Sequence, residues 1–523
     1  MDITALPQNE VKDKPDFFPQ DPLAAKPVNA PPVSSSPKIN QEAVAVPPWM
    51  PTPQNAPATP PLTTTSSLPV YSPAVSPKGG GGIKKILTIL AILIALGSLA
   101  YLGYYFFSSK IRLPIGKKIT LNYWGLFEPD VVFKQVIADF EKEHPQIKIQ
   151  YTESKLIEYR ERLQNALVSD SGPDVFRLHQ SWIPMFGKNL SPVPSTVYDS
   201  ASFEKTFYPS AKESLTYNRQ LVAVPLMVDG LALFYNEDLL KAAGQTPPRD
   251  WKQLRNVALK LVSRDEQGKL RTAGVSLGAT NVDHWSDILG LIMLQNGADL
   301  ANPTYCGEVE GLAGKVCPAA DALSFFTLFT TVDHSWEATM PSSTFAFATG
   351  NLGMYFGPSW RVFDIEKLKI DYKSNVKYKI IPVPQLEGGN VNWSTYWAEG
   401  VSKNSSHQAE AWEFVRYLSS KEVMQKLYQG QKSLRLFGEP FSRTDLAEML
   451  KTEPLISAFI EQAPTAKNWY LSSNTFDNGI NKQITDYYAK ALDAVNSGQD
   501  PLKALETTAQ GVTQVLRQYG LAR

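Results

Sequence analysis

The chain contains 523 residues with 51 basic and 51 acidic side chains, so its formal net charge is zero. This balance does not indicate a nucleic-acid partner, which would require a basic stripe, and none is expected. Neither sign of charge dominates, so a strongly anionic or cationic ligand is not indicated, and the length allows more than one domain.

Residues 1–82 form the first predicted segment, which is rich in proline, serine, threonine and alanine and ends in the glycine run 79–82. Such a composition lacks the apolar periodicity and mass that a buried core requires. We therefore predict a disordered tail that ends in a flexible glycine linker.

Residues 83–107 form the second predicted segment, and no charged residue occurs from Ile86 to Phe107. This run has about the 20 residues that a helix needs to cross a bilayer, and tyrosines cluster at its end as in an interfacial aromatic belt. A buried core helix is rarely so uniformly apolar, and a cleaved signal peptide has a shorter apolar core at the very N-terminus. The pattern predicts a single transmembrane helix over residues 83–107.

The orientation of this helix is not set by the flanking charges, because basic residues lie on both sides of it. The two cysteines, Cys306 and Cys317, lie close together with glycines between them. Two cysteines alone cannot build a zinc site, and we expect a disulfide in preference to two buried thiols. A disulfide favours an oxidising compartment, so the C-terminal part is predicted to be extracytoplasmic and the N-terminal tail cytoplasmic.

From about Lys117 onward the sequence has a globular pattern in which strand-like and helix-like segments alternate. Strand patterns occur at residues 118–127, 146–151 and 173–179, and helix patterns at residues 130–144 and 159–172. This alternation predicts a mostly parallel α/β sheet. About four hundred residues exceed one such core, so we expect two lobes.

Six segments in a fixed order carry a resemblance to a known family. In the sequence they read ITLNYW…FKQVIADFEKEHPQIKIQY, YRERLQNALVSDSGPDVF, LVAVPLMVDGLALFYNEDLLKAAGQTPPRDWKQL, FATGNLGMYFGPSW, IIPVPQ and GVSKNSSHQAEAWEFVRYLSSKE. This succession resembles the extracellular solute-binding proteins of ABC importers, in the family that includes the maltose-binding proteins. The resemblance covers the chain from about Ile119 to the C-terminus.

The resemblance implies a two-lobe α/β fold of the periplasmic-binding-protein type II, with a hinge and a ligand cleft between the lobes. The N-lobe would comprise about residues 117–228 and 399–444, and the C-lobe about residues 229–398 and 445–523. Closure of the lobes on the ligand is the expected motion.

The same resemblance implies a function in transport. The protein would be a monomeric solute-binding subunit held in the bacterial cell membrane by its one helix, and its partners would be a small-molecule solute, a sugar or oligosaccharide, and ABC permease subunits. No cofactor is expected. The alternative is a sugar or solute sensor, or an adhesion module, that reuses the same fold.

A sugar site needs flat aromatic faces for the C–H-rich face of the ring and polar groups for its hydroxyl edge. Trp124, Phe127 and Glu128 end the first predicted strand and enter the next loop, at the edge of the sheet where open α/β folds bind ligands. Trp124 could instead lie in the core, and Glu128 could simply lie near the next helix.

Four further residues are ligand-binding candidates through the resemblance. Gln180 and Trp182 lie where maltose-binding proteins present polar contacts, but the acidic–basic pair of those proteins is missing here, which argues against maltose itself. Trp182 could instead pack on the lobe surface. Trp360 follows FGPS, a family position for a stacking aromatic, and Trp397 lies in STYWAEG. Trp285, which opens an apolar helix, is a further ligand-binding candidate that does not depend on the resemblance.

Asp229 lies between the apolar runs LVAVPLMV and GLALFY. A buried carboxylate is costly unless it is paired or hydrogen-bonded. The resemblance places Asp229 at the first crossing between the lobes, facing the cleft, where it would accept hydroxyl protons of a sugar. Alternatively, it would only satisfy backbone amides of the hinge.

Two Asp-His motifs, VDHW and VDHSW, would bind a metal only if they met in space. They are far apart in the sequence, so no metal site is predicted. The sequence contains no HExxH motif or P-loop. A glycosidase would need two carboxylates at a defined separation, and we expect a binding protein rather than an enzyme.

Overall fold

The computed structural model describes Ser98 and residues 118–522, except residues 170–171, 309–313, 474 and 476–477. The predicted tail at residues 1–82 and the predicted transmembrane helix at residues 83–107 lie outside the described residues, apart from Ser98. Among the described residues, no helix is long and apolar enough to span a membrane. The membrane anchor therefore remains a prediction.

The N-lobe is built on a six-stranded sheet in the order β15-β14-β3-β1-β2, with β6 paired to β14. Its strands are β1 (Ile119–Leu126), β2 (Ile147–Ser154), β3 (Val175–His179), β6 (Ala223–Gly230), β14 (Asn392–Val401) and β15 (Ala466–Lys467). Its helices are α2 (Asp130–Glu143), α3 (Tyr159–Val168), η1 (Gln180–Trp182), α4 (Ile183–Phe186), α5 (Ser200–Thr206), α6 (Pro209–Ser214), α13 (Gln408–Leu418) and α14 (Lys421–Lys432), beside a small ribbon of β4 (Thr216–Tyr217) and β5 (Gln220–Leu221).

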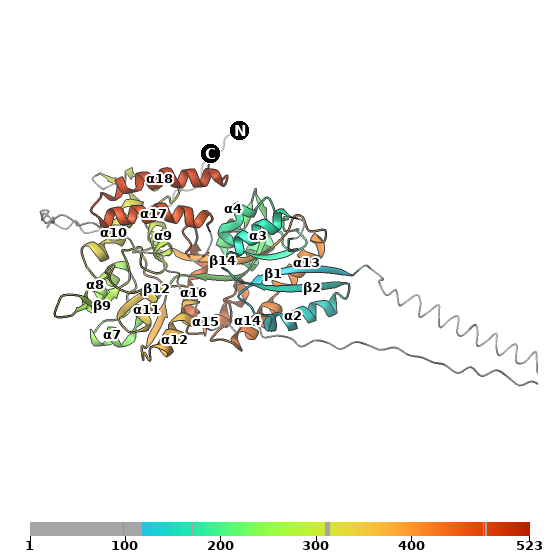
Figure 1. Cartoon of the computed structure of the whole chain (residues 1–523), viewed down its shortest axis with the longest axis horizontal. Helices are drawn as coiled ribbons and strands as arrows, with labels where there is room; N and C mark the ends of the chain where they lie inside the picture. The colour runs from blue at the N-terminus through green and yellow to red at the C-terminus, as the bar shows by residue number, and fades with distance from the viewer. Residues whose placement is uncertain are drawn as a thin grey trace, which may run out of the picture. The chain divides into compact units, whose positions relative to one another are not determined.

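The C-lobe is built on a five-stranded sheet in the order β13-β7-β12-β9-β8. Its strands are β7 (Ala232–Asn236), β8 (Ser263–Arg264), β9 (Leu270–Val275), β12 (Leu352–Gly357) and β13 (Tyr378–Ile381). Its helices are α7 (Glu237–Ala242), α8 (Trp251–Leu261), α9 (Trp285–Gln295), α10 (Pro318–Thr331), α11 (Ser343–Ala348), α12 (Arg361–Asp371), α16 (Ser457–Gln462), η3 (Ala463–Thr465), α17 (Ile480–Asn496) and α18 (Pro501–Gln518). Between α14 and α16 the chain forms η2 (Thr444–Leu446) and α15 (Ala447–Lys451). The last two helices, α17 and α18, pack along each other (Figure 1).

The predicted helix after the first strand shows why these elements form. In α2, Val132, Phe133, Val136 and Phe140 recur at helical spacing and are buried, so they make one apolar face. That face packs on β2 (Figure 1), and the Phe133 ring meets Tyr123 of β1 edge-on at a centroid distance of 5.5 Å.

The sheets are mixed rather than mostly parallel. In the N-lobe, β1, β2 and β3 are parallel, but β14 runs antiparallel to both β3 and β6. In the C-lobe, β7 is antiparallel to both of its neighbours. Because β6, β7 and β14 lie where the chain crosses between the lobes, they reverse the direction that a simple strand–helix alternation predicts.

The expected lobe boundary at residues 398/399 falls inside a strand. Strand β14 begins at Asn392 and pairs with β6 from Ser394 onward. Residues 392–398 therefore belong to the N-lobe sheet, and the chain returns from the C-lobe before Asn392. A disulfide joins Cys306 and Cys317, which flank the short strands β10 (Gly307–Glu308) and β11 (Lys315–Val316) of the C-lobe.

Gly230 ends β6 at the crossing into the C-lobe. A Cβ at this position would lie 2.1 Å from the carbonyl oxygen of Trp393 in β14, and backbone cannot yield as a flexible side chain can. We expect Gly230→Ala to lower the free energy of unfolding by about 1–3 kcal/mol in urea denaturation. Gly430→Ala in α14 is the control, since its nearest atom would be Val132 Cγ1 at 3.3 Å and alanine favours a helix. Equal unfolding midpoints for Gly230→Ala and the parent would contradict this expectation.

Candidate functional site

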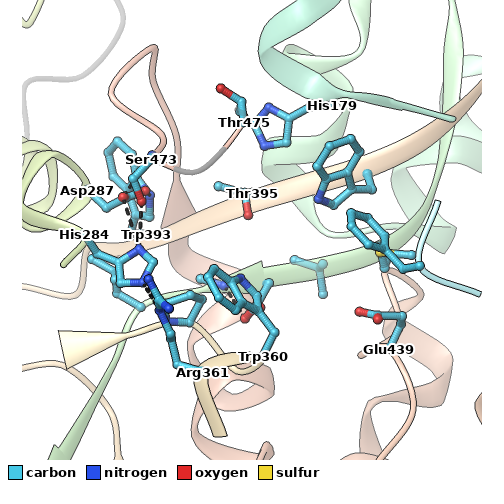
Figure 2. A pocket seen from close by; sticks show the side chains of 18 of the residues that line it. His179, His284, Asp287, Trp360, Arg361, Trp393, Thr395, Glu439, Ser473 and Thr475 are labelled. Carbon is cyan, nitrogen blue, oxygen red and sulfur yellow. Dashed lines mark hydrogen bonds and ion pairs between the residues drawn. The ribbon is translucent and has the colours of Figure 1, made fainter. Parts of the chain in front are cut away.

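A cavity of about 400 Å³ lies between the two lobes, within the range of about 300–1,000 Å³ typical of small-molecule sites. Three sets of residues line it: Phe127, His179 and Trp397 from the N-lobe sheet and its loops, Trp360, Arg361 and His284 from the C-lobe, and Asp229, Trp393 and Thr395 from the hinge strands. Figure 2 shows the labelled members of this lining. A ligand in the cavity would contact both lobes at once.

The N-lobe contributes an aromatic wall. The rings of Phe127 and Trp397 meet edge-on at a centroid distance of 5.1 Å, and Trp397 also contacts His179 at 5.0 Å and Trp182 at 5.3 Å. Phe127 has a φ of 73°, a left-handed conformation that a bulky residue rarely adopts and that clusters at functional sites. The backbone is thus held in an unfavourable state in order to place this ring beside the cavity.

The C-lobe contributes Trp360, which follows β12 and precedes the first turn of α12. The guanidinium carbon of Arg361 lies 4.4 Å from the centroid of the Trp360 ring, a cation–π contact. The His284 ring meets Trp360 edge-on at 5.5 Å. Two polar neighbours therefore fix the orientation of this indole at the cavity (Figure 2).

Behind Trp360, a chain of hydrogen bonds stiffens the C-lobe wall. Arg361 Nε donates to His284 Nε2 at 2.8 Å, and His284 Nδ1 lies 2.7 Å from Ser473 Oγ. Because Nε2 accepts from Arg361, the ring proton is on Nδ1, and burial together with Arg361 holds the pKa of His284 well below its usual range. Asp287 completes the chain, since it accepts from Ser473 N at 3.0 Å and from Trp393 Nε1 at 2.9 Å (Figure 2).

Asp229 joins the hinge strand β6 to the C-lobe. Its Oδ1 accepts the backbone N–H of Gly230 at 2.8 Å and of Ser359 at 3.0 Å, and its Oδ2 accepts the Ser359 hydroxyl at 2.9 Å. Ser359 lies between β12 and α12, so the carboxylate ties the two lobes together. The acid therefore satisfies hinge amides, as the alternative interpretation held, and it also lines the cavity.

The buried carboxyl of Asp229 is expected to make the free energy of unfolding depend on pH. Burial raises its pKa from 3.8 to about 7, and the hydrogen bonds from Ser359 and Gly230 offset this only in part. The folded protein then keeps a proton that the unfolded chain releases, so this carboxyl's contribution to stability is full below about pH 4 and is lost as the pH rises to about 7. We expect the unfolding free energy of the parent, relative to Asp229→Asn, to fall across this range in urea titrations. A relative stability that rises with pH would contradict the assignment.

Of the other residues predicted from the sequence, several lie outside the cavity. Glu128, Gln180 and Trp182 are buried and are not among the residues that line it. Trp124 packs partly buried against the N-lobe core. Trp285 lines an adjoining open hollow along α3 and α17, which shares Ser473 and Thr475 with the cavity. The prediction that these five contact the cavity's ligand is therefore not supported by their positions.

Glu128 is instead part of a buried charged cluster of the N-lobe. The Arg177 side chain pairs with Glu128 and Glu399, and its Nε donates to Glu399 Oε1 at 2.7 Å. Tyr123 donates its hydroxyl to the same oxygen at 3.0 Å. All four side chains are buried, and burial raises the pKa of both glutamates, with Arg177 lowering it only in part.

This buried charged cluster joins the two strands, β3 and β14, that also carry residues of the cavity. Arg177 pairs with Glu399 across β3 and β14, and two residues further along His179 pairs with Trp397. Residues two apart on a strand lie on the same face of the sheet. The ion-paired residues therefore lie on the same face as the cavity residues and fix the two strands that carry them.

The sequence reasoning missed His179, Trp393, His284 and Asp287 as lining residues. His179 had a usable signal, because it ends a predicted strand at the carboxyl edge where α/β sheets bind ligands. Trp393 lies only a few residues before the predicted Trp397 on the same strand. Within the described ranges, no group of three or more His, Cys, Asp or Glu side chains could hold a metal ion.

Two α/β lobes, the strands that cross between them and a cavity lined from both lobes define a two-lobe solute-binding protein. The family described as bacterial extracellular solute-binding protein matches residues 125–425, and the chain belongs to this family. Its relatives include a multiple sugar-binding protein of Streptococcus mutans, 22% identical over 399 residues that cover 74% of this chain and 91% of the relative. A maltotriose-binding protein of Pyrococcus abyssi is 24% identical over a match that covers 64% of this chain and 70% of the relative.

Solved structures show the same fold. The sugar-binding protein MalE from Xanthomonas citri superimposes with a TM-score of 0.61 at 21% identity, over 76% of this chain and 98% of that one. An ABC transporter solute-binding protein from Thermotoga lettingae, bound with α-D-tagatose, superimposes with a TM-score of 0.56 at 20% identity. The match covers 76% of this chain and 100% of that one. At this level of identity the likeness establishes the fold.

Proposed function

We propose that this protein binds a carbohydrate in the cavity between its lobes and delivers it to the permease of an ABC importer. The observation that carries the proposal is the lining itself, in which aromatic rings from both lobes alternate with polar groups. Aromatic faces suit the C–H-rich face of a sugar, and the polar groups suit its hydroxyls. The sugar-binding names of the relatives from Streptococcus mutans and Pyrococcus abyssi support this ligand class.

Binding rather than turnover is the role that we propose for the site. A glycosidase needs one carboxyl as an acid and a second as a base or nucleophile on either side of the scissile bond. Four acidic residues line the cavity. Asp229 accepts hydrogen bonds from Ser359 and Gly230, and Asp287 accepts them from Trp393 and Ser473. Asp364 and Glu439 form ion pairs with Arg361 and Arg435. The oxygens of Asp229 and Asp287 hold the walls of the cavity together.

Attachment to the membrane forms the second part of the proposal. The predicted helix at residues 83–107, which is uncharged from Ile86 onward, would anchor the chain in the bacterial cell membrane as a single-pass helix, with residues 118–522 outside the cell and the N-terminal tail in the cytoplasm. A tether of this kind keeps a binding protein near its permease and raises the effective concentration of the loaded form. The disulfide between Cys306 and Cys317 supports the extracytoplasmic location.

Isothermal titration calorimetry of the full chain tests the ligand class. The panel comprises maltotriose, maltotetraose, D-tagatose and further mono- and oligosaccharides, with amino acids and short peptides as the comparison set. At least one saccharide is expected to bind with a Kd in the micromolar range or below. Binding of amino acids or peptides while every saccharide fails would overturn the carbohydrate assignment, and release of hydrolysed sugar would overturn the assignment as a binding protein.

A further inference from the structure

His179 is held in one tautomer by its neighbours. This residue ends β3 and lines the cavity, and its Nδ1 lies 2.6 Å from Ser181 Oγ and 3.3 Å from the backbone N of Ser181. A backbone amide can only donate, so Nδ1 must carry a lone pair and the ring proton must be on Nε2. Burial also lowers the pKa of His179 to about 3, so the ring is neutral at physiological pH.

The other lobe reaches the same hydrogen-bond chain. Asn481, in the first turn of α17, donates from Nδ2 to Ser181 Oγ at 2.6 Å. The hydroxyl of Ser181 can donate its one proton to His179 Nδ1 while its oxygen accepts from Asn481. All three side chains are buried, so water does not compete for these bonds. Asn481 Nδ2 also lies 3.4 Å from Oγ1 of Thr475, another lining residue.

The remaining polar atom of the ring is Nε2, which carries the proton. Among the residues that the structure describes, no hydrogen bond from this atom is formed, and His179 is one of the labelled lining residues in Figure 2. A fixed N–H donor at a cavity wall selects a ligand oxygen, because an N–H group or a cation at the same place would leave the donor unsatisfied.

We propose that Asn481 is a positioning residue: when the lobes meet, it acts through Ser181 to hold His179 as an Nε2–H donor for an oxygen of the ligand. Recognition by an N-lobe side chain then depends on a C-lobe side chain, which couples ligand selection to lobe closure. The inference rests on the proposed function for the nature of the ligand, since a sugar hydroxyl or ring oxygen is the acceptor. The tautomer itself does not depend on any ligand.

The tautomer is tested by NMR of the full chain labelled with 15N in its histidines, without ligand. The signals of His179 are identified by their loss in His179→Gln. We expect a protonated Nε2 and an unprotonated Nδ1, with no change between pH 5 and pH 8. A protonated Nδ1 would overturn the inference, even if no saccharide bound and the proposed function had already failed.

The role of Asn481 is tested by calorimetry with maltotriose as the probe. Asn481→Ala is expected to weaken binding about tenfold, the effect of losing one buried hydrogen bond to a ligand-facing group. The matched control is Asn496→Ala on the same helix, whose amide donates to Gly278 O at 2.8 Å within the C-lobe and whose loss is expected to leave affinity unchanged. Thermal unfolding of both variants separates lost binding from lost folding.

A double-mutant cycle decides whether Asn481 acts through Ser181. If it does, Asn481→Ala weakens binding in the parent but causes no further loss of affinity in a Ser181→Ala background. Additive losses, or unchanged affinity in Asn481→Ala, would overturn the coupling between the lobes. If the parent does not bind maltotriose, that result counts against this sugar under the proposed function, and the cycle is measured instead with the tightest-binding saccharide of the panel.

Discussion

Replacing Arg177 by methionine is expected to lower the free energy of unfolding by about 3–5 kcal/mol in urea denaturation at pH 7. The side chain is fully buried and pairs with both Glu128 and Glu399, which are buried as well. Without the guanidinium, two carboxylates would remain in a low-dielectric interior with no opposite charge. They would have to ionise at high cost or take up protons at neutral pH.

The loss of stability in Arg177→Met is expected to depend on pH, which distinguishes lost charge pairing from lost packing. In the unfolded chain both glutamates have ordinary pKa values near 4.5, whereas burial already raises the pKa of Glu128 to about 7 in the folded parent. Removing Arg177 raises the folded pKa values further. Between about pH 4.5 and pH 7 parent and variant therefore lose stability in parallel on account of Glu128, and the variant's deficit grows as the pH rises above about 7. A deficit that stays constant as the pH rises above about 7 would point to lost packing instead.

A triple variant is the control for lost packing. Arg177→Met combined with Glu128→Leu and Glu399→Met replaces all three charged groups by apolar side chains, and replacing a whole buried ion-pair group by apolar residues of similar volume is often close to neutral. We expect the triple variant to recover most of the stability that the single variant loses. If both variants unfold at the same midpoint, the charges of this cluster do not set the stability of the N-lobe.

Much of the fold could be predicted from local sequence patterns. The apolar spacing at residues 130–144 predicted a helix, and α2 spans Asp130–Glu143. The parts that failed depend on partners far away in the sequence. Nothing local to β14 shows that it pairs with β3 and β6, because the same alternation of side chains serves a strand in either lobe. For this reason the expected boundary fell inside β14.

The candidate site was harder to predict, because residue type indicates chemistry but not the direction in which a side chain points. Phe127, Trp360 and Trp397 line the cavity, whereas Trp182 is equally aromatic but packs behind Trp397 at 5.3 Å. Glu128 directly follows Phe127 but faces Arg177 in the core. Whether a residue at the carboxyl edge of the sheet faces ligand or core is decided by tertiary packing.

Asp229 shows the same limit for a polar residue. Its place between two apolar runs predicted a hydrogen-bonded carboxylate, and the family resemblance implied a hinge position; both agree with its contacts. The partner, Ser359, comes from the other lobe and is separated by most of the C-lobe sequence. A single sequence gives no signal for this contact. The hydrogen bonds between Asp229 and Ser359, which join the two lobes, are therefore evident only in the folded protein.

Trp360→Ala is expected to weaken saccharide binding by about 30- to 1,000-fold, which corresponds to about 2–4 kcal/mol. Trp360 lines the cavity, and Arg361 and His284 fix its indole at the wall. Truncation removes a pre-oriented face for the sugar ring, and solvent would fill the space. Calorimetry with the tightest-binding saccharide of the panel measures the loss, and Trp360→Phe should retain part of the affinity because it keeps an aromatic face.

Trp285→Ala provides the matched control for this prediction. Both tryptophans are partly buried and lie at the start of a C-lobe helix, but Trp285 lines the adjoining hollow along α3 and α17 and not the cavity itself. Its truncation should change affinity less than about threefold while costing a similar amount of stability, which thermal unfolding of both variants would show. Should Trp285→Ala abolish binding while Trp360→Ala leaves it intact, the ligand site would be the hollow along α3 and α17, and the proposed cavity would be wrong.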